Sequence, residues 1–495
     1  MLFPAQDRYL RLPVRLAREL RRRSAGGPSA DDHHFLGGHL NRLEKGAEGY
    51  KGVARGKGIL SPRLWPFVTE YQVPRGTRDL LPETMAKYAL VERKLREAAR
   101  LFGFREVRTP TFEATELFTA RSGDSIIEEM YVFSDKGDRS MALRPEITAS
   151  VVRMYLNEMT KSPKPIKVSY LGSCFRYEKP QTGRFREFFQ FGAEILGAPA
   201  LESDAEMIAL ASDALSRLGI ADLVIRIGQI GIMRQMLQST RVPREGWPAI
   251  LHSIDKKEFG QMEAAFEDYG DGGSSDKFSA LAELKGGREV LAEAREISGE
   301  MEALTYLSTL FDRLEKMGVK GLTVDVGVVR GLDYYTGMVF EVDSPSLGAE
   351  KQVCGGGAYA LAEVFGGEPI QSTGFAMGID RLVLALERQG YAFDLSGVWA
   401  YVIPLGEKAV APALGLAAEM RMAEISTDLE MMGRNLSKAL AYADVCKARY
   451  AIILGERDLA AGNATIRDMK TGDQKPTKLT EIVKIFQALI QHEKQ

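Results

Sequence analysis

The segment Phe175–Gly197 reads FRYEKPQTGRFREFFQFGAEILG and decides how the chain folds. Its two flanks alternate between polar and apolar residues around the turn-forming stretch Lys179–Gly183, so the segment predicts an antiparallel hairpin. Residues two apart share one face of a strand. The shared face is predicted to carry Arg176, Glu178, Arg186, Phe188, Gln190 and Glu194. Buried charges need partners, so we interpret this face as a ligand surface; a salt-bridged surface hairpin is the alternative.

The side chains on this face suit two kinds of chemical group. Guanidinium groups such as that of Arg176 match phosphate oxygens. Phe188 offers a flat ring on which a base can stack. The carboxylates suit an ammonium or an amine. The segment therefore favours a site that binds both a nucleotide and an amine.

The same segment resembles motif 2 of class II aminoacyl-tRNA synthetases, in the form found in histidyl-tRNA synthetases. Val329–Val342, VRGLDYYTGMVFEV, is similar to the histidine-specific signature of that family, and Gly374–Leu386, GFAMGIDRLVLAL, is similar to motif 3. Phe102–Phe112, FGFREVRTPTF, resembles motif 1, whose strand and proline build the dimer interface of these enzymes. The order and spacing agree with the family from about residue 70 to residue 495.

The resemblance implies an enzyme that ligates L-histidine to tRNA(His) through a histidyl-adenylate, with ATP as substrate, Mg2+ on the ATP phosphates and a homodimeric assembly. The residues implied to stabilise charge at the α-phosphate are Arg176 and Arg330. Those implied for ATP binding are Arg176, Glu178, Arg184, Phe188 and Arg381. Those implied for histidine binding are Glu146, Thr148, Gln190, Glu194, Tyr334, Tyr335 and Tyr359. Candidates for contact with the tRNA acceptor end are Gln181 and Arg186.

Some of these side chains also have a purely structural interpretation. Glu146 stands at the start of an expected helix, where the helix dipole favours an acid. For Arg381 the alternative is an ordinary surface arginine on an amphipathic helix, although the presence of motif 2 favours the functional role. The chain departs from the usual family residues beside two site residues, at Ile147, Ala358 and Ala360.

Composition narrows the class of protein. A chain of 495 residues predicts about three domains, and its net charge of −2 means that nucleic-acid binding would rely on local patches. Cys174, Cys354 and Cys446 are far apart and form no CxxC pair, which fits a reducing compartment and suggests neither a disulfide framework nor a zinc site. No apolar run approaches the roughly 20 residues that span a bilayer. We expect a cytoplasmic protein with no membrane contact and no metal held by protein ligands.

The first 67 residues differ from the rest of the chain. They contain 13 Lys/Arg against 6 Asp/Glu, Gly-rich patches, and the cluster His33, His34 and His39. Three interpretations stay open: a disordered extension, an organelle-targeting peptide within about the first 30 residues, or a segment that is not translated because Val68 supplies an alternative start. The histidines could hold a metal, but a histidine-rich tail is the simpler explanation.

The remaining chain predicts an α+β fold in two large parts. Residues 68–397 are expected to form the catalytic domain, an antiparallel sheet flanked by helices, with a helical insertion at about 230–320. Residues 398–495 alternate strand and helix, which predicts an α/β domain with a mainly parallel sheet. The resemblance implies that this domain binds the anticodon and that the insertion leans over the tRNA acceptor end. An ordinary α/β domain and a solvated helical surface are the alternatives.

Two other functions compete with the ligase. One is a synthetase-like histidine-binding regulatory subunit of histidine biosynthesis; such paralogues typically lack the anticodon domain and have eroded phosphate contacts. Here residues 398–495 are present, and so are Arg176, Arg184 and Arg381. The other is a synthetase for a different amino acid of the same subclass, which the Arg330–Tyr335 signature disfavours.

Overall fold

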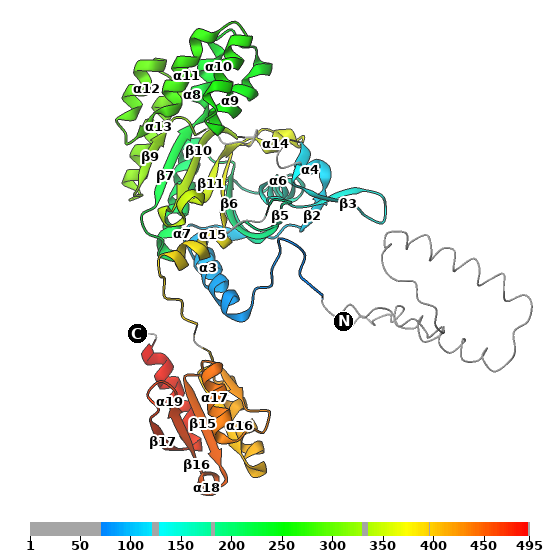
Figure 1. Ribbon diagram of the computed structural model, residues 1–495, viewed down its shortest axis with the longest axis vertical. Helices are drawn as coiled ribbons and strands as arrows, with labels where there is room; N and C mark the ends of the chain where they lie inside the picture. The colour runs from blue at the N-terminus through cyan, green and yellow to red at the C-terminus, as the bar shows by residue number, and fades with distance from the viewer. Residues whose placement is uncertain (1–70, 121–127, 180–183, 329–334, 396, 494–495) are drawn as a thin grey trace, which may run out of the picture. The chain divides into compact units, whose positions relative to one another are not determined.

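The computed structural model (Figure 1) describes residues 71–120, 128–179, 184–328, 335–395 and 397–493. The predictions made for residues 1–67, Gln181, Arg330 and Tyr334 lie outside the described residues. The described part combines a large, mostly antiparallel sheet with helices and a separate C-terminal sheet. This arrangement is the predicted α+β class.

The large sheet has the strand order β1-β5-β6-β12-β11-β10-β7-β9-β8. Its strands in that order are β1 (Arg105–Glu106), β5 (Ile166–Phe175), β6 (Glu187–Leu196), β12 (Ser372–Gly378), β11 (Gln352–Tyr359), β10 (Tyr335–Asp343), β7 (Val224–Gln229), β9 (Leu322–Asp325) and β8 (Lys285–Gly286). Among the described pairings, β1 with β5 and β7 with β9 are parallel and the others are antiparallel.

The predicted hairpin is formed by β5 and β6, which pair along all ten residues of each strand. Phe191, Ala193 and Ile195 of β6 pack into the main core. Gln190 and Glu194 therefore take the opposite face, as the alternation of residues predicts. The hairpin is confirmed, and its polar face is the floor on which the site is built.

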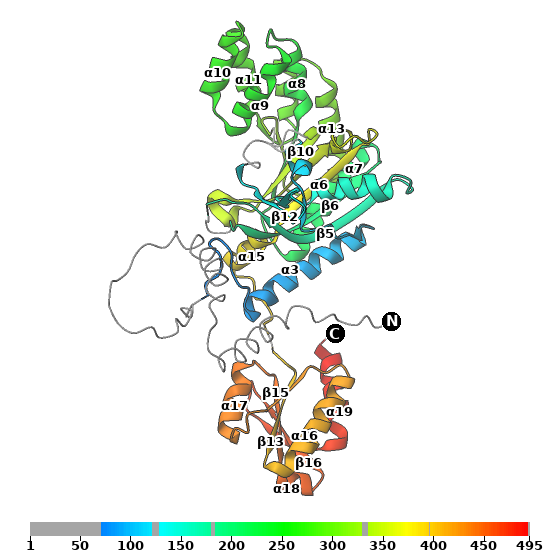
Figure 2. The same cartoon turned by 90° about the vertical axis from the view of Figure 1, so that its right-hand side faces the viewer.

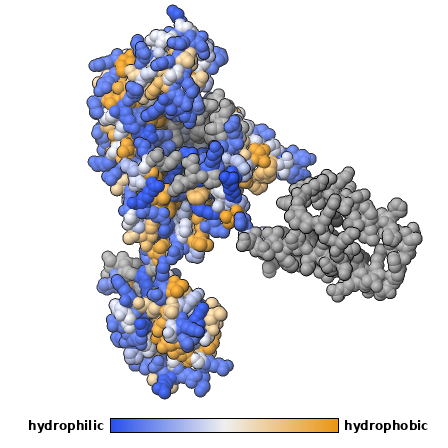
Figure 3. Space-filling view, in the orientation of Figure 1, coloured by the Kyte–Doolittle hydropathy of each residue, from blue (hydrophilic) through white to orange (hydrophobic). Residues whose placement is uncertain are grey.

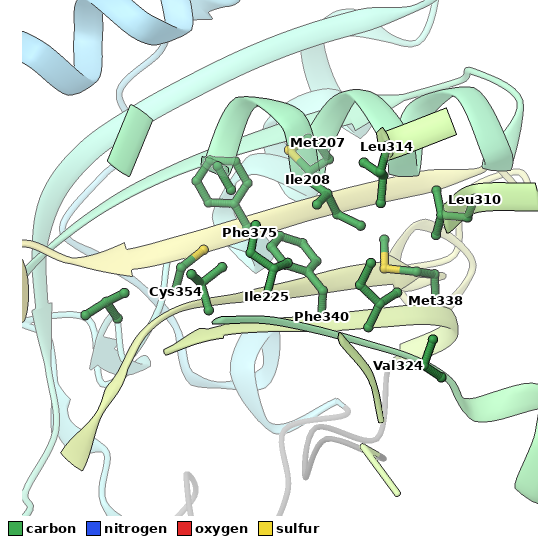
Figure 4. Close-up of a cluster of buried hydrophobic side chains, with 14 of the residues drawn as sticks. Met207, Ile208, Ile225, Leu310, Leu314, Val324, Met338, Phe340, Cys354 and Phe375 are labelled. Atoms are coloured by element: carbon green, nitrogen blue, oxygen red, sulfur yellow. The ribbon is translucent and has the colours of Figure 1, made fainter. Parts of the chain in front are cut away.

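Helices cover the core face of this sheet. They include α3 (Pro82–Leu101), α7 (Ala200–Leu218) and α15 (Ile379–Arg388). Figure 2 shows α3 and α15 side by side along β5 and β6. Figure 4 shows Met207 of α7 and Leu314 of the later helix α13 (Glu302–Lys316) facing Phe340 and Phe375 of the strands. This apolar layer fixes the strands that carry the site from behind.

Leu90, Leu95, Ala98 and Leu101 recur at helical spacing, which predicts that they form the buried stripe of α3, and the structure differs from this in part. Leu95 is buried as expected, but Leu90 is only partly buried and Leu101 is 50% exposed. Tyr88 and Val91 point into the core instead. The difference arises because Leu101 lies in the last turn of the helix, where the chain leaves the core for the positive-φ turn that follows.

A small sheet and a short helix flank the hairpin on the ligand side. The sheet has the order β2 (Phe112–Ala114), β4 (Ser140–Leu143), β3 (Tyr131–Ser134). The sequence predicts strands at Met130–Asp135 and Met141–Pro145, and β3 and β4 confirm both. Helix α6 (Thr148–Met154) follows β4 and packs with β5 through Val151, which is buried.

The insertion predicted at about 230–320 is helical. It comprises α8 (Ile230–Gln238), α9 (Trp247–Lys256), α10 (Phe259–Asp268), α11 (Ser275–Glu283), α12 (Val290–Ser298) and α13. The stretch Gly270–Ser275 is rich in Gly, Ser and Asp and predicts a break between helices. It contains the 3-10 turn Gly272–Ser274. Figure 3 shows mainly hydrophilic residues on the visible surface of these helices, with scattered apolar ones. In the described part of the chain, no helix is both long enough and apolar enough to cross a membrane.

The C-terminal sheet corrects the prediction of a mainly parallel arrangement. Its order is β14 (Thr427–Leu429), β13 (Ala400–Leu405), β15 (Tyr450–Gly455), β16 (Asn463–Asp468), β17 (Gln474–Lys478). The first three strands are parallel and joined through α16 (Val410–Met422) and α17 (Leu436–Val445), but β16 and β17 are antiparallel. A parallel pairing needs a crossover of a dozen or more residues, and the turn before β17 has only five.

A buried carboxylate holds the loop that follows β14. Glu430 accepts hydrogen bonds from the Tyr401 hydroxyl at 2.7 Å, from Nη1 of Arg434 at 2.9 Å and from the backbone N–H of Met432 at 2.6 Å. Burial alone would raise the pKa of Glu430, but these hydrogen bonds outweigh it and lower the pKa to about 2. The ionised form is therefore the one that the fold stabilises.

Replacing this carboxylate is expected to destabilise the C-terminal sheet. Because the folded-state pKa of Glu430 is depressed below its usual 4.5, its contribution is complete above pH 4.5 and lost as the pH falls toward 2. Glu430→Gln should lower the free energy of unfolding by about 2 kcal/mol at pH 7. Hydrogen exchange of peptides from β13 and β15 in urea measures this. Glu419→Gln on an exposed face of α16 is the control, and equal exchange in both variants would contradict the prediction.

Candidate active site

A cavity of about 580 Å³ lies against strands β6, β10, β11 and β12. Most of the described residues predicted for the site line it. They are Glu146, Thr148, Arg176, Glu178, Arg184, Phe188, Gln190, Tyr335, Tyr359 and Arg381. These residues come from segments up to 235 positions apart (Glu146 to Arg381), so the sheet brings together what the sequence separates.

Two described candidates do not line the cavity. Glu194 is fully buried beneath it. Arg186 places its guanidinium carbon 3.6 Å from the ring centroid of Tyr177 and donates to the backbone carbonyl of Glu178 at 3.3 Å. Arg186 therefore packs on the hairpin loop, although the alternation pattern had grouped it with the ligand face.

Three hydroxyl groups surround the buried carboxylate of Glu194. Thr148 and Tyr170 donate to Oε1 at 2.8 and 3.1 Å, and Tyr359 donates to Oε2 at 2.8 Å. Burial raises the pKa of Glu194 to about 8, although the hydroxyl hydrogen bonds act in the opposite direction. Since Thr148 and Tyr359 line the cavity and direct their hydrogens to Glu194, their oxygens offer lone pairs to a ligand.

The carboxylate of Glu194 has room only because its neighbour on β12 is glycine. Gly374 pairs with Glu194 in the register of β12 and β6. A Cβ atom built on Gly374 would lie 1.5 Å from Oε2 of Glu194, well inside van der Waals contact. The Gly-rich character of this part of the sheet therefore serves the close approach of a side chain.

Glu146 sits at the N-terminus of α6. Its Oε2 accepts from the backbone N–H of Thr148 at 2.5 Å, and its Oε1 accepts from that of Ala149 at 2.9 Å. Burial raises its pKa, while these backbone hydrogen bonds counteract the rise. Glu146 therefore caps the start of the helix, as its purely structural interpretation predicts. The same residue also lines the cavity. Ile147, which replaces the family glycine, has a φ of −113° and so needs no glycine.

A buried arginine holds the turn that presents Glu146. Arg144 donates from Nε to the carbonyl of Ser173 at 2.7 Å and from Nη1 to the carbonyl of Thr109 at 3.1 Å. It packs where Gly172 of β5 leaves space, since a Cβ there would lie 2.2 Å from Nη2 of Arg144. The turn that carries Glu146 is thus held against the hairpin by hydrogen bonds from the Arg144 side chain to backbone carbonyls.

Three guanidinium groups also line the cavity. Arg176 donates from Nε to the carbonyl of Pro145 at 3.0 Å, and its guanidinium carbon lies 5.4 Å from the ring centroid of Phe188. Arg184 lies 3.5 Å from the carboxylate of Glu178. Arg381 donates to the carbonyl of Gln352 at 2.7 Å. Three guanidinium groups around one cavity favour a ligand with several anionic oxygens.

Several cavity residues were not singled out by the sequence analysis. They are Glu129, Phe185, Asp255, Lys256, Glu341, Gln352 and Asp380. Asp255 and Lys256 end helix α9 of the insertion, and no local pattern distinguishes them from the solvated charges of that helix. Among the described residues, no group of three His, Cys, Asp or Glu side chains is placed to hold a metal ion.

Comparison with known families follows the same division of the chain. Residues 76–382 match the family model for histidyl-tRNA synthetase, and residues 400–489 match the model for the anticodon binding domain. The first match covers the large sheet and the helical insertion, and the second covers the C-terminal sheet.

Individual proteins similar to this chain carry the same description. A histidine–tRNA ligase of Methanoregula boonei is 43% identical over 404 residues, which are 82% of this chain and 95% of that protein. One of Archaeoglobus fulgidus is 41% identical over 420 residues, 84% of this chain and 99% of that protein. The crystal structure of apo S. aureus histidyl-tRNA synthetase superposes with a TM-score of 0.64 at 29% identity, covering 84% of this chain and 100% of that one.

Proposed function

Because this chain belongs to the histidyl-tRNA synthetase family, we infer that it is a histidine–tRNA ligase, a class II aminoacyl-tRNA synthetase. The observation that supports this most is the composition of one cavity. A polar end built on the hydroxyls around Glu194 adjoins an end that carries Arg176, Arg184 and Arg381. One cavity thus offers polar groups for an amino acid and guanidinium groups for a polyphosphate. A regulatory histidine-binding subunit would not need these arginines.

We propose that histidine binds at the polar end. Glu146 takes its α-ammonium, with Thr148 and Gln190 beside it. A neutral imidazole has one N–H donor and one nitrogen acceptor. The hydroxyl of Tyr359, whose hydrogen is already donated to Glu194, accepts the imidazole N–H. Tyr335, which pairs with Tyr359 across β10 and β11, shapes the pocket, and so does Tyr334, which lies outside the described residues.

ATP is proposed to bind at the guanidinium end. Phe188 stacks on adenine, Glu178 holds the adenine or its ribose side, and Arg184 and Arg381 hold the γ-phosphate. Arg176, joined by Arg330 from outside the described residues, stabilises charge at the α-phosphate. Magnesium enters with ATP on its phosphates, where it would neutralise part of their charge.

The proposed reaction consists of two displacement steps, the first releasing pyrophosphate and the second AMP. A carboxylate oxygen of histidine attacks the α-phosphorus, the bond from that phosphorus to the bridging oxygen breaks, and pyrophosphate leaves. The 3′-terminal adenosine hydroxyl of tRNA then attacks the acyl carbon of the adenylate, the bond from that carbon to the phosphate oxygen breaks, and AMP leaves while the hydroxyl proton passes to its phosphate or to water. We assign no side chain as an obligatory general base, so positioning and electrostatic stabilisation supply the rate.

The finer organisation is also a proposal. Residues 68–397 act as the catalytic domain and residues 398–495 bind the anticodon of tRNA(His), with Gln181 and Arg186 near the acceptor end. Two copies assemble as a homodimer through the segment that resembles motif 1. Cys174, Cys354 and Cys446 are far apart in the sequence and form no CxxC pair, which supports a cytoplasmic location, where thiols stay reduced.

The test is ATP–pyrophosphate exchange with each of the twenty amino acids in the absence of tRNA. Exchange with histidine alone is the expected result. Exchange with another amino acid would keep the class of enzyme and overturn the assignment of the pocket. No exchange, with histidine still bound in calorimetry, would favour the regulatory subunit.

A further inference from the structure

One carboxylate at the ATP end of the cavity joins segments that are far apart in sequence. Asp380, buried in the first turn of α15, accepts hydrogen bonds from the Arg78 guanidinium, from the Tyr88 hydroxyl at 2.8 Å and from the backbone N–H of Phe189 at 2.9 Å. Arg78 itself also donates to the Tyr88 hydroxyl at 2.6 Å. Asp380 thus attaches the loop before α3, helix α3 and strand β6 to the helix that carries Arg381.

Arg78 contacts the wall of the cavity as well. Its guanidinium carbon lies 3.4 Å from the ring centroid of Phe185, a distance at which a cation and an aromatic face attract each other. Phe185 and Asp380 line the cavity, whereas Arg78 does not. The loop that carries Arg78 is also fixed beside Phe185, because the backbone N–H of Arg186 donates to the carbonyl of Gly76 at 2.8 Å. Arg78 is therefore in contact with two residues of the wall from outside the cavity.

The geometry calls for a guanidinium group and not merely a positive charge. A planar guanidinium can donate hydrogen bonds in its plane to Asp380 while its face covers the ring of Phe185, which a lysine ammonium cannot do. Nη1 of Arg78 is buried yet has no hydrogen-bond partner within the described part of the chain. An unsatisfied buried donor is unfavourable for folding, so stability alone does not explain an arginine at this position.

We propose that Arg78 is a positioning residue for the ATP end of the site, an inference that rests on the proposed function. By holding Phe185 and Asp380, it fixes the start of α15 and hence Arg381, the next residue, relative to the hairpin. It acts through these residues without touching the substrate. The histidine end is built by Glu194, Thr148 and Tyr359, whereas the described hydrogen bonds of Asp380 go to Arg78, Tyr88 and Phe189.

The proposal predicts a selective kinetic defect. In ATP–pyrophosphate exchange, Arg78→Ala should raise KM for ATP about tenfold and lower kcat about tenfold, while KM for histidine stays within twofold of wild type. Arg78→Lys should remain close to Arg78→Ala, because the charge is kept but the fork and the stack are lost. Guanidinium chloride at about 10 mM should restore part of the activity of Arg78→Ala and leave wild type unchanged relative to an equal concentration of NaCl.

The control is Arg96→Ala on α3. Arg96, like Arg78, forms ion pairs, but its partners Glu92 and Glu106 do not line the cavity. This variant should leave all three constants unchanged. Wild-type kinetics in folded Arg78→Ala would overturn the proposal. So would an equal loss of affinity for both substrates without guanidinium rescue, because that pattern indicates a purely structural role.

Two further measurements keep the test decisive. If Arg78→Ala does not fold, Phe185→Leu removes the ring and leaves the contact between Arg78 and Asp380; an unchanged KM for ATP in this variant would overturn the proposal. If wild type shows no exchange with any amino acid, the proposed function fails on its own. Arg78 is then tested by the Kd for ATP in calorimetry, where an unchanged value in Arg78→Ala overturns the inference and a raised value supports it.

Discussion

Arg176→Ala is expected to lower kcat for histidine-dependent ATP–pyrophosphate exchange by a factor of about 10²–10³, the effect of removing one preorganised donor from a developing charge. Arg176 lines the cavity, and its Nε is fixed by the carbonyl of Pro145 at 3.0 Å, so the other nitrogens are directed without a further loss of freedom. Because the donor acts mainly in the transition state, kcat and kcat/KM should fall together.

Steady-state exchange over a range of ATP concentrations checks this prediction. Arg139→Ala, at an exposed arginine that pairs with Asp135, should behave as wild type and controls for the loss of a positive charge. A variant of Arg176 that raised KM for ATP with kcat unchanged would show that the residue binds the ground state only. The proposed role at the α-phosphate would then be wrong.

At about pH 9, where Glu194 is ionised, Glu194→Gln is expected to raise KM for histidine about 100-fold and to leave KM for ATP within twofold. The amide keeps the shape of the side chain but replaces one acceptor oxygen by a donor NH2 group. One of the hydroxyls of Thr148, Tyr170 and Tyr359 must then turn its hydrogen away from residue 194. Where that hydroxyl faces the cavity, an acceptor becomes a donor, and mismatched polar groups reject a ligand strongly.

Tyr170→Phe provides the matched comparison. Tyr170 contacts Glu194 but does not line the cavity, so removing its hydroxyl takes away one donor without changing the surface that the ligand meets. Its effect on KM for histidine should lie well below that of Glu194→Gln. Equal effects of the two variants would indicate that the whole pocket had been disturbed, and the argument from hydroxyl orientation would fail.

The same carboxyl group gives a pH dependence. Burial raises the pKa of Glu194 to about 8 in the free protein, so below that pH it is protonated and one of its oxygens becomes a donor. The pocket is then disturbed as in Glu194→Gln. The ratio of kcat/KM for histidine in wild type to that in the variant should therefore rise as the pH increases through about 8. The ratio cancels the ionisations of free histidine, and a flat ratio would contradict the prediction.

The effect on stability has the opposite sign. The folded-state pKa of Glu194 lies above its usual 4.5, so the folded protein binds the proton more tightly than the unfolded chain does. The stabilising contribution is complete below pH 4.5 and is lost as the pH rises through about 8. The ionisation that organises the pocket is thus the one that the fold opposes, as is common at functional sites.

Patterns within one segment predicted the local parts of the site well. The period of two in Phe175–Gly197 correctly separated Gln190 from Phe191. The Gly-rich stretch Val353–Tyr359 also predicts a strand, and it is observed as β11. These predictions depend on neighbouring residues, whose faces follow from strand geometry alone. The same reasoning placed Arg186 on the ligand face, because alternation ignores the nearby ring of Tyr177 that attracts its guanidinium.

Features that join distant segments had no signal in the sequence. The contact of Arg78 with Asp380 spans 302 positions, and Lys256 reaches the cavity from the insertion. The depth of Glu194 depends on the register of β6 with β5 and β12, which hydrophobic patterning leaves undetermined because a shift by two residues keeps the same faces. The prediction of a mainly parallel C-terminal sheet followed the alternation of strands and helices. It missed the antiparallel strands β16 and β17, which are indicated instead by the short turn that joins them.

The glycine opposite Glu194 has a consequence for how this pocket can evolve. Any side chain at position 374 would occupy the space of the carboxylate, so substitutions at 194 and 374 cannot be accepted independently. Shortening residue 194 would remove the contact with its carboxylate, but a Cβ atom at 374 would still lie 2.8 Å from the backbone carbonyl oxygen of Ala193. A side chain at 374 therefore requires both a shorter residue 194 and a local shift of β6 against β12, so this glycine limits the substitutions through which the pocket can change its amino-acid specificity.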